Sequence, residues 1–353
     1  MSESGAPSGP AVPLVTRERG WWRLIIAIAL LLLVPMTPIL RILLPVDQTV
    51  VLLAPALAGC ALVGWWAGGR FGLALVWTLL AGWILWRFAS GQGTVALLTC
   101  GWAVMLSTVF GSVGLLRTGG DIAQRAFFPR ALVAIGVTCL LFLMVAVVVP
   151  SGPTVVLEAV RAEVARRADE ALTGWHQTTS TKEWVDLITR YPDAGNVSKQ
   201  MESQLQGTPS FALVLFPSML ALESLAALTV AWALYHRVGR ARLGLPLAAL
   251  REFRFNDQLV WGIVAGFVLV LVPWFTSLSS MGANLLVFFA TIYALRGLGV
   301  ALWFLAPGRM LMTILIGFSL FFWHVLGVMA LGLGLGDTWL DWRTRARKRA
   351  AQK

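Results

Sequence analysis

The feature that most constrains this chain is a series of apolar runs, each long enough to cross a lipid bilayer as a helix or nearly so. A helix needs about 20 apolar residues to cross about 30 Å of hydrocarbon. The runs are continuous rather than alternating, which favours helices over a transmembrane β-barrel. We therefore expect an all-α, polytopic transmembrane helical bundle of about nine spans, at 21–44, 49–68, 72–89, 94–116, 131–150, 209–234, 259–275, 282–305 and 310–335.

Composition agrees with this class. Hydrophobic residues make up 58% of the 353-residue chain and charged residues only 13%, whereas soluble domains carry about 25% charged residues. The formal net charge is +11, but the basic residues gather between the runs and at the C-terminus, where membrane orientation and anionic headgroups account for them. We therefore expect the lipid bilayer as a partner and no nucleic acid.

The polar stretches divide the chain into five parts. Residues 1–20 are rich in Ser, Gly and Pro and should be a disordered tail. Spans one to five occupy 21–150, and an extracytoplasmic amphipathic segment follows at 151–208. Spans six to nine occupy 209–335, and the chain ends in a basic tail at 336–353.

Orientation follows from the loop at 235–258, which carries a net charge of +3. Short loops rich in Lys and Arg stay on the cytoplasmic side, so this loop is expected inside. Counting back places the N-terminus in the cytoplasm and the segment 151–208, of net charge −2, outside. The expected location is the inner (cytoplasmic) membrane of a bacterium.

Nine spans conflict with the charge rule at one place. They would leave the tail, of net charge +4, outside the cell. Either the tail is an exception, since earlier helices usually dominate, or one run does not cross fully. The candidates are the proline-broken run 21–44 and the glycine-rich end of 310–335.

The segment 151–208 is patterned rather than random. Apolar residues recur at helical spacing at Leu157, Val160, Val164, Ala168 and Ala171. This pattern predicts amphipathic helices that lie on the outer membrane surface or roof the bundle.

Three spans carry an ionisable residue near mid-depth: Glu223, Arg296 and His324. Such a residue costs at least about 2.5–3.5 kcal/mol on insertion, so it needs a partner or a purpose. Our hypothesis is that Glu223 and Arg296 meet inside the bundle with His324 near them, and that Asn284 adds hydrogen bonds or caps its helix. The cluster is either a pair that fixes helix packing or a site for a polar ligand or proton.

Sequence motifs for catalysis are missing. The chain has no P-loop, HExxH, GxSxG or CxxC pattern, and its three histidines are scattered. Its three cysteines lie in apolar runs without metal-like spacing. We therefore expect no enzyme activity, no catalytic residues, and no cofactor or metal site.

Three short motifs resemble the YybS-like family of predicted bacterial multi-span membrane proteins, a domain of unknown function. They are Phe216-Pro217-Ser218 at the opening of a span, Leu245-Pro246 with Phe253-Arg254 leading to Trp261, and Asn284 with Leu295-Arg296-Gly297-Leu298 and the tail Asp337 to Arg343. The resemblance covers about residues 20–345. It implies a polytopic membrane protein. The family commonly has Gln at the place of Arg296, so this charge would be particular to this branch.

The first six spans are also similar to the substrate-binding components of energy-coupling-factor vitamin transporters, which have six helices with both ends inside. The alanine pattern with which those proteins dock their partner is absent. Ala27 and Ala29 are followed four residues later by Leu31 and Leu33. This departure argues against coupling to such a transporter.

Two functions are compatible with these features. The first is a transport-type protein that binds a small-molecule solute among the spans, with 151–208 as an outer lid. The second is a non-catalytic scaffold in cell-envelope assembly, whose basic loop 235–258 recruits a protein partner.

Overall fold

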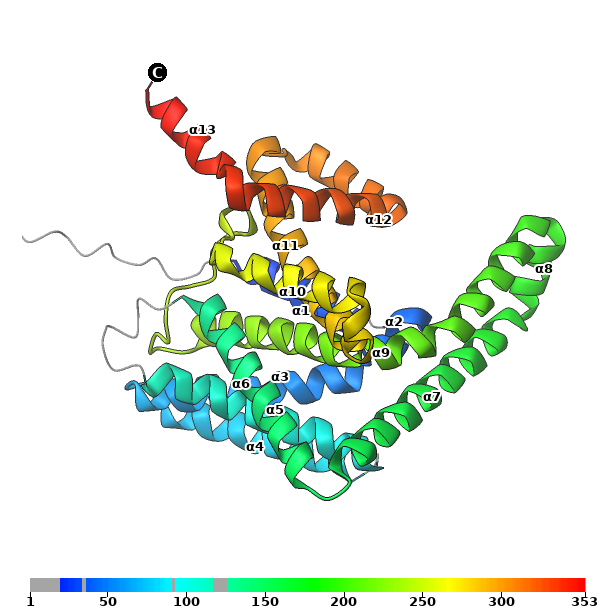
Figure 1. The fold of residues 1–353 in the computed structure, drawn as a ribbon, viewed down its shortest axis with the longest axis horizontal. Helices are drawn as coiled ribbons and strands as arrows, with labels where there is room; N and C mark the ends of the chain where they lie inside the picture. Colours follow the sequence, from blue (N-terminus) through cyan, green and yellow to red (C-terminus); the bar gives the residue numbers. More distant parts are fainter. Residues whose placement is uncertain (1–19, 34–35, 91–92, 117–125, 353) are drawn as a thin grey trace, which may run out of the picture.

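A computed structural model describes residues 20–33, 36–90, 93–116 and 126–352, and its secondary structure within these ranges is helical, without strands. The expected all-α class is confirmed, whereas the expected disordered tail lies almost wholly outside the described residues. The helices are α1 (Trp21–Leu33), α2 (Pro38–Leu43), α3 (Val46–Trp66), α4 (Phe71–Ala89), α5 (Gly93–Leu116), α6 (Phe127–Val148), α7 (Gly152–Thr179), α8 (Lys182–Arg190), α9 (Pro192–Val238), α10 (Val260–Leu271), α11 (Ser279–Leu305), α12 (Arg309–Leu340) and α13 (Trp342–Ala351), drawn in Figure 1.

The nine apolar runs do not become nine equal helices. Among the described residues, six helices are long and apolar enough to cross a membrane: α3, α4, α5, α6, α9 and the stretch Pro273–Leu305 that contains α11. Helix α12 would be a seventh, but it is bent by 112° between Met310–Ser319 and His324–Leu340. The run 259–275 forms the shorter apolar helix α10, which is followed by a 3-10 turn at Pro273–Leu278.

The first run breaks into α1 and α2, which together lead from one end of the bundle to the other. Leu24 of α1 packs against Val230 and Ala233 near the end of α9. Ile42 of α2 packs instead with Leu205 in the first half of α9. We call the end of the bundle at residues 239–259 the loop face and the opposite end the arm face.

Helices α3 and α9 form the centre of the bundle. In α3, 67% of the most apolar stretch is buried, against 11% in α4, so α4 lies at the periphery. The core joins Leu57 and Cys60 of α3 to Leu228 and Trp232 of α9. Because hydrophobic burial does not drive helices together in lipid, close packing of such small and large side chains carries the association.

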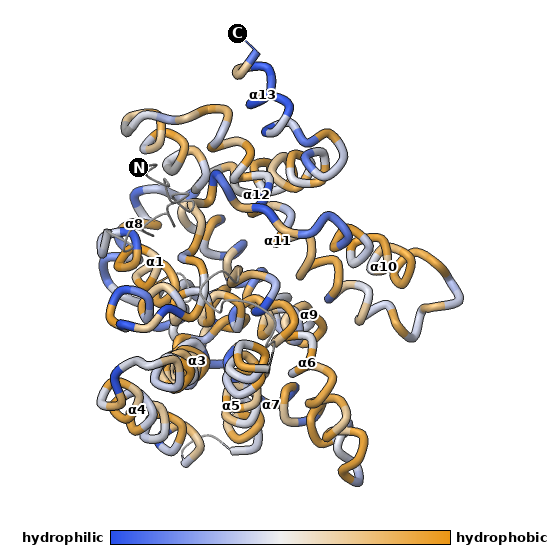
Figure 2. The backbone as a smooth tube through the Cα atoms, turned by 90° about the vertical axis from the view of Figure 1, so that its left-hand side faces the viewer, coloured by the Kyte–Doolittle hydropathy of each residue, from blue (hydrophilic) through white to orange (hydrophobic). Residues whose placement is uncertain are grey.

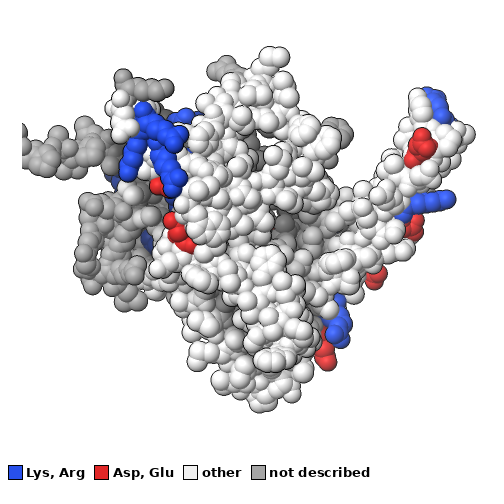
Figure 3. Space-filling view, turned by 45° about the horizontal axis from the view of Figure 1, so that its top comes forward, with Lys and Arg blue, Asp and Glu red and all other residues white. Residues whose placement is uncertain are grey.

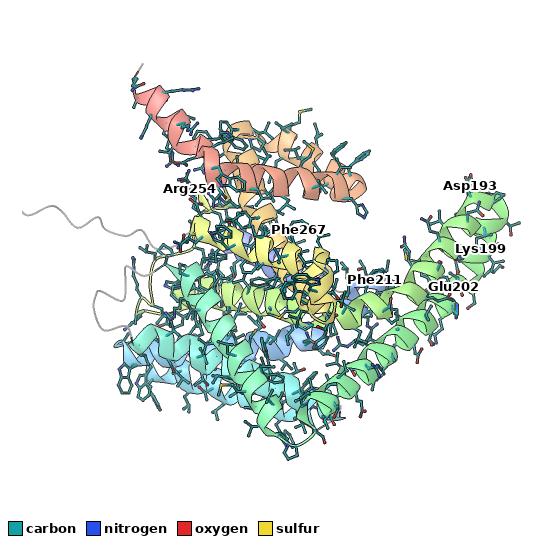
Figure 4. All side chains as sticks on the ribbon, viewed as in Figure 1. Asp193, Lys199, Glu202, Phe211, Arg254 and Phe267 are labelled. Atoms are coloured by element: carbon teal, nitrogen blue, oxygen red, sulfur yellow. The ribbon has the colours of Figure 1, made fainter. Side chains whose placement is uncertain are left out.

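A long arm leaves the bundle at the arm face, formed by α7, α8 and the first half of α9 (Figure 1). Val164 and Ala168 of α7 pack in one cluster with Leu205 of α9, and His176 bonds to Glu202 at 3.0 Å. Most of the predicted apolar stripe is therefore buried, in a cluster of α7 with α9 and α2, whereas Leu157 at its start is 49% exposed. The arm neither roofs the bundle nor lies across it. In Figure 4 the labelled side chains of Asp193, Lys199 and Glu202 lie on this arm, away from the bundle.

Charged side chains gather at the two ends of the molecule. Figure 3 shows Lys and Arg around α13 and both signs of charge along the arm, with a broad uncharged surface between them. The hydropathy colouring of Figure 2 likewise shows mostly apolar backbone outside α13 and the polar arm. This distribution is that of a helical membrane protein, with an apolar zone between two polar ends.

The C-terminal helix α13 lies beside the loop at 239–259, and this contact corrects the expected topology. Arg343 donates to the carbonyl oxygens of Arg251 and Phe253 at 3.0 and 3.2 Å, and Arg347 pairs with Glu252 at 2.8 Å. Figure 4 shows Arg254 beside the start of α13, where it pairs with Asp341. The basic tail is therefore on the same face as the basic loop.

Helix α12 begins as well as ends at the loop face. Met312 in its first turns borders the same cavity as Arg237 and Arg251. Its end is held by the contacts of Arg343. With a 112° bend between Met310–Ser319 and His324–Leu340, the run 310–335 is not one straight span: it is either a broken span or a re-entrant pair of helices.

Two glycines allow the second arm of α12 to cross α11 at backbone contact. A Cβ atom at Gly297 would overlap the carbonyl oxygen of Ala330, and one at Gly334 would overlap that of Tyr293. Small residues at such crossings let helix backbones approach closely. This crossing brings the end of α12 against Arg296, one residue before Gly297.

Candidate functional site

The buried carboxyl group of Glu223 lies at the centre of the bundle and is held by two side chains from the start of α3. The Thr49 hydroxyl donates to its Oε1 at 2.5 Å, and the Gln48 amide donates to its Oε2 at 2.6 Å. All three side chains are buried. Because a buried polar group without a partner is costly, a donor at each carboxyl oxygen makes this a satisfied polar site.

The hydrogen bonds continue from Gln48 towards the arm. Arg167 of α7 donates through Nη2 to Gln48 Oε1 at 3.1 Å and through Nε to Glu163 Oε1 at 2.8 Å. The Gln48 amide therefore donates to one charged group and accepts from another, which defines its orientation. We call Glu163, Arg167, Gln48, Thr49 and Glu223 the outer polar chain.

The outer end of this chain is a strong ionic group. Glu163 accepts from Arg167 and also from Arg166, whose Nε and Nη2 lie 2.9 and 2.6 Å from its two oxygens. Burial alone would raise the pKa of Glu163. The hydrogen bonds from Arg166 and Arg167 outweigh it, so the pKa of this carboxyl is lowered from its usual range. Glu163 is therefore the anion that positions both arginines.

A cavity of about 250 Å³ adjoins the chain where α2, α3 and α7 meet. Its polar lining comprises Arg41, Asp47, Arg166, Arg167 and Glu170. Arg166 also pairs with Glu170, whereas Arg41 and Asp47 have no ion-pair partner within the part of the chain that the structure describes. Beside the buried Arg167, the cavity thus presents a cation, Arg41, and an anion, Asp47, that form no ion pair with any described residue.

Asn284 takes part in a different arrangement, at the proline break of α9. Pro217 has no backbone N–H, so the hydrogen-bond ladder of α9 opens there. Ser218 N donates to Asn284 Oδ1 at 2.8 Å, and Asn284 Nδ2 donates to the carbonyl oxygens of Val214 and Ser280, each at 2.7 Å. Asn284 therefore bonds to two backbone groups of α9 beside Pro217 and fixes α11 to α9.

Arg296 lies in a second ionic group, at the loop face. It pairs with Asp257 at 2.6 Å and with Asp337 at 3.1 Å, and Arg343 pairs with Asp337 at 2.7 Å. Arg296, Asp337 and Arg343 are each 3% exposed or less. We call Asp257, Arg296, Asp337 and Arg343 the inner ion cluster. They join α11, α12, α13 and the basic loop.

The structure does not bring the expected cluster together. Glu223 and Arg296 make no ion pair with each other: Glu223 is bound by α3 and Arg296 by two aspartates. His324 is exposed on α12, and 13 residues separate it from Asp337, about 20 Å along a helix. The two groups also lie at different depths, because Glu223 bonds to the start of α3 beside the arm whereas Arg296 pairs with Asp257 at the loop face.

Sequence reasoning missed the partners of both charges. Gln48 and Thr49 stand at the predicted start of a span, next to Asp47, where polar residues are ordinary. Asp337 was assigned to the basic tail. A charged residue in an apolar run indicates that a partner exists, but it does not indicate where that partner lies in the sequence.

Metal binding has no support in the ranges 20–33, 36–90, 93–116 and 126–352. No group of three or more His, Cys, Asp or Glu side chains there is placed to hold an ion. The cysteines at 60, 100 and 139 are free.

Comparison with known proteins gives one match. Residues 84–338 match the family described as "Predicted membrane protein (DUF2232)". No curated protein and no solved structure matches the chain. The matched range contains Glu223, Asn284, Arg296 and Asp337, whereas Gln48 and Thr49 lie before it.

Proposed function

We propose, from the premise that this chain belongs to the DUF2232 family of predicted membrane proteins, that it is a small-solute-binding protein of the transport type. The observation that carries the proposal is the cavity beside the outer polar chain. It offers Arg41 and Asp47, and a neighbouring arginine, Arg167, connects it by hydrogen bonds to Glu223 in the bundle centre. A solute in the cavity would contact Arg167 and so alter the hydrogen bonds that lead through Gln48 to Glu223.

The chemistry of the lining favours a small zwitterion. Arg41 would bind a carboxylate or phosphate, and Asp47 would bind an ammonium group, each as a charge-assisted hydrogen bond. A volume of about 250 Å³ suits a molecule of amino-acid size, below the roughly 300–1,000 Å³ of sites for drug-sized ligands.

Through Gln48, a solute bound in the cavity could change the hydrogen bonds of Glu223. Gln48 is the uncharged link between Arg167 and Glu223. A solute anion that attracts Arg167 would free the Gln48 carbonyl and alter the donors around Glu223. This step supports binding with a conformational response and requires no catalysis, so we infer that the protein is not an enzyme.

The finer assignment and the orientation belong to the same proposal. The motifs around Pro217, Pro246 and Arg296 support the YybS-like assignment within the family. The net charge of the loop 235–258 and of the tail on one face supports a cytoplasmic loop face, a cytoplasmic N-terminus and an extracytoplasmic arm in a bacterial inner membrane. Cysteine labelling near Trp175 in intact cells should modify the arm. If the loop near Pro246 were labelled in intact cells and the arm were not, the protein would have the opposite orientation.

Thermal stabilisation of the purified full-length protein by free amino acids tests the binding proposal. We expect at least one amino acid to raise the melting temperature of the wild type. Arg41→Gln and Asp47→Asn should each weaken that response about tenfold or more, since each removes a hydrogen bond to a charged group. Glu223→Gln should also reduce it, because the carboxylate at the end of the chain is lost.

Arg87→Gln is the matched control. Arg87 is an exposed arginine in the last turn of α4, outside the cavity lining. Its variant should respond like the wild type. Failure of every amino acid to stabilise the protein, or equal responses from Arg41→Gln and Arg87→Gln, would contradict the proposal.

A second candidate is a membrane scaffold in cell-envelope assembly, which the arm favours. Val185, Tyr191 and Val197 near its tip are each more than half exposed although apolar or aromatic. Exposed apolar side chains mark a protein contact site where they gather into one patch, so the scaffold proposal requires these three to be covered by a partner. Proximity labelling from the arm tip and from the loop 235–258 should then return one recurrent protein. Recovery of only random neighbours counts against the scaffold.

A further inference from the structure

A second and larger cavity, of about 800 Å³, opens at the loop face. It lies between α1, the end of α9, the loop residues 247–251 and the junction of α11 with α12. It shares no lining residue with the outer cavity. Its chemistry therefore needs a separate explanation.

The charged residues of this lining all have the same sign. They are Arg23 of α1, Arg237 of α9 and Arg251 of the loop. Arg23 and Arg251 are exposed, and no acidic side chain in the described ranges pairs with either. Arg237 is partly buried and donates to the carbonyl oxygen of Ala233 at 2.8 Å. Three guanidinium groups from three elements thus surround one hollow, and no carboxylate is among the described residues that line it.

The lining changes from basic to apolar with depth. Ala27 stands four residues beyond Arg23, about 6 Å further into the bundle along α1. Val230 stands seven residues before Arg237, about 10 Å deeper along α9. Leu302 of α11 adds an apolar wall. An occupant must therefore carry its negative charge at the loop face and its apolar part towards the bundle centre.

The walls continue into surfaces that face lipid. Ile26 and Leu30 of α1 are 40% and 56% exposed, and Met310 and Met312 of α12 are 81% and 39% exposed. In a protein with an apolar zone between two polar ends, such side chains contact acyl chains. An amphiphile could enter the cavity sideways from the adjacent leaflet without leaving the bilayer.

We propose that this cavity binds one anionic phospholipid from the leaflet at the loop face, with its phosphate between Arg23, Arg237 and Arg251. Basic pockets between membrane helices bind anionic lipid headgroups, and arginine can form bidentate hydrogen bonds with their phosphate. A zwitterionic lipid fits less well, since its ammonium group would meet the arginines.

Native mass spectrometry of the full-length protein in neutral detergent tests this directly. The probes are dioleoyl phosphatidylglycerol and dioleoyl phosphatidylcholine, which share their acyl chains and differ in net charge. We expect one phosphatidylglycerol molecule to bind more than about tenfold tighter than phosphatidylcholine. The double variant Arg23→Gln/Arg251→Gln should weaken the binding of phosphatidylglycerol about 25-fold, which is about fivefold for each arginine.

The control is Arg240→Gln/Arg345→Gln. Both arginines are exposed at the loop face, neither lines the cavity, and the change in net charge is the same. This double variant should bind phosphatidylglycerol like the wild type. Equal weakening by both double variants would overturn the proposal, since the attraction would then come from the general charge of the face.

Two further measurements separate a lipid from a free anion. Ala27→Trp leaves the charge unchanged and fills the apolar depth of the cavity from an exposed position of α1. It should abolish the preference for phosphatidylglycerol while the protein keeps its wild-type melting temperature without lipid. Unchanged lipid binding in Ala27→Trp, or displacement of the lipid by inorganic phosphate at equal concentration, would overturn the proposal.

Discussion

The outer polar chain and the inner ion cluster are both buried sets of charged groups, but they are built differently. In the inner cluster, Arg296 and Arg343 share Asp337, and Arg296 has Asp257 as well. In the outer chain a neutral amide, Gln48, separates the charges, and a cavity lies beside it. One set joins helices by direct ion pairs, whereas the other relays hydrogen bonds between helices and borders space for a ligand.

The difference teaches that burial of a charge is a weak guide to function. Arg296 stands in an apolar run, as a ligand-binding arginine would, yet its contacts hold the end of α12 and the basic loop in place. Buried ion pairs are costly to break even when they add little net stability. Adjacent space is the better indicator, together with exposed charges such as Arg41 and Asp47 that form no ion pair within the described part of the chain.

The largest effect should come from Asp337→Asn, which removes the shared anion of the inner cluster. Arg296 would keep only Asp257, and Arg343 would keep only carbonyl oxygens. Loss of one partner from a buried charge pair costs about 3–5 kcal/mol. We expect a lower free energy of unfolding in detergent and rapid proteolysis of α13.

Asp341→Asn is the control for this change. Asp341 makes an exposed pair with Arg254, which is worth about 0–1 kcal/mol. Asn also tolerates the left-handed backbone of this residue, at φ 40°. If Asp337→Asn also abolished solute binding by the molecules that remain folded, the two regions would not be independent.

An intermediate effect is expected for Gln48→Leu, which interrupts the outer chain at similar volume. Glu223 Oε2 would lose its donor and Arg167 would lose an acceptor. Each unsatisfied buried group costs about 1–3 kcal/mol, and the response to solute should disappear. Thr49→Ser keeps its hydroxyl donor and should behave like the wild type in both thermal unfolding and solute response. A Gln48→Leu protein that still responds to solute would show that the amide does not transmit occupancy.

The smallest effect is the pH dependence of the arm. Because the folded protein lowers the pKa of Glu163, its ionic bonds contribute stability above the unfolded pKa of about 4.3. That contribution is lost as the pH falls through the lower folded pKa. Melting curves of the wild type should therefore decline below about pH 4.3 more steeply than those of Glu163→Gln. Parallel curves would show that Glu163 does not stabilise the arm.

The class of fold was predictable because run length and composition are properties of short stretches. Most of the predicted spans agree with helices such as α3 and α9, and the amphipathic stripe of Val164 and Ala168 is buried as its spacing requires. The number of crossings was not predictable in the same way. Nothing in the apolar run 310–335 states that it bends by 112°.

The candidate site was predictable only in part. Glu223 and Arg296 were correctly marked as groups that need partners, and each has them. Their expected contact was wrong because a position near the middle of an apolar run does not fix its depth: Glu223 faces the start of α3 and Arg296 faces the basic loop. Asn284 was marked for hydrogen bonding, and its partners are the backbone groups opened by Pro217.

By itself, the amino-acid sequence determined that this protein is a bundle of membrane-crossing helices with a polar helical segment at 151–208, a basic loop and a basic tail. Hydrophobicity and charge act on each segment separately, so a linear reading suffices for them. Only the tertiary structure decided that Glu223 meets Gln48, 175 residues away, and that Arg296 meets Asp337, 41 residues away. Such contacts depend on which helix faces overlap, and this is settled by the packing of the whole bundle.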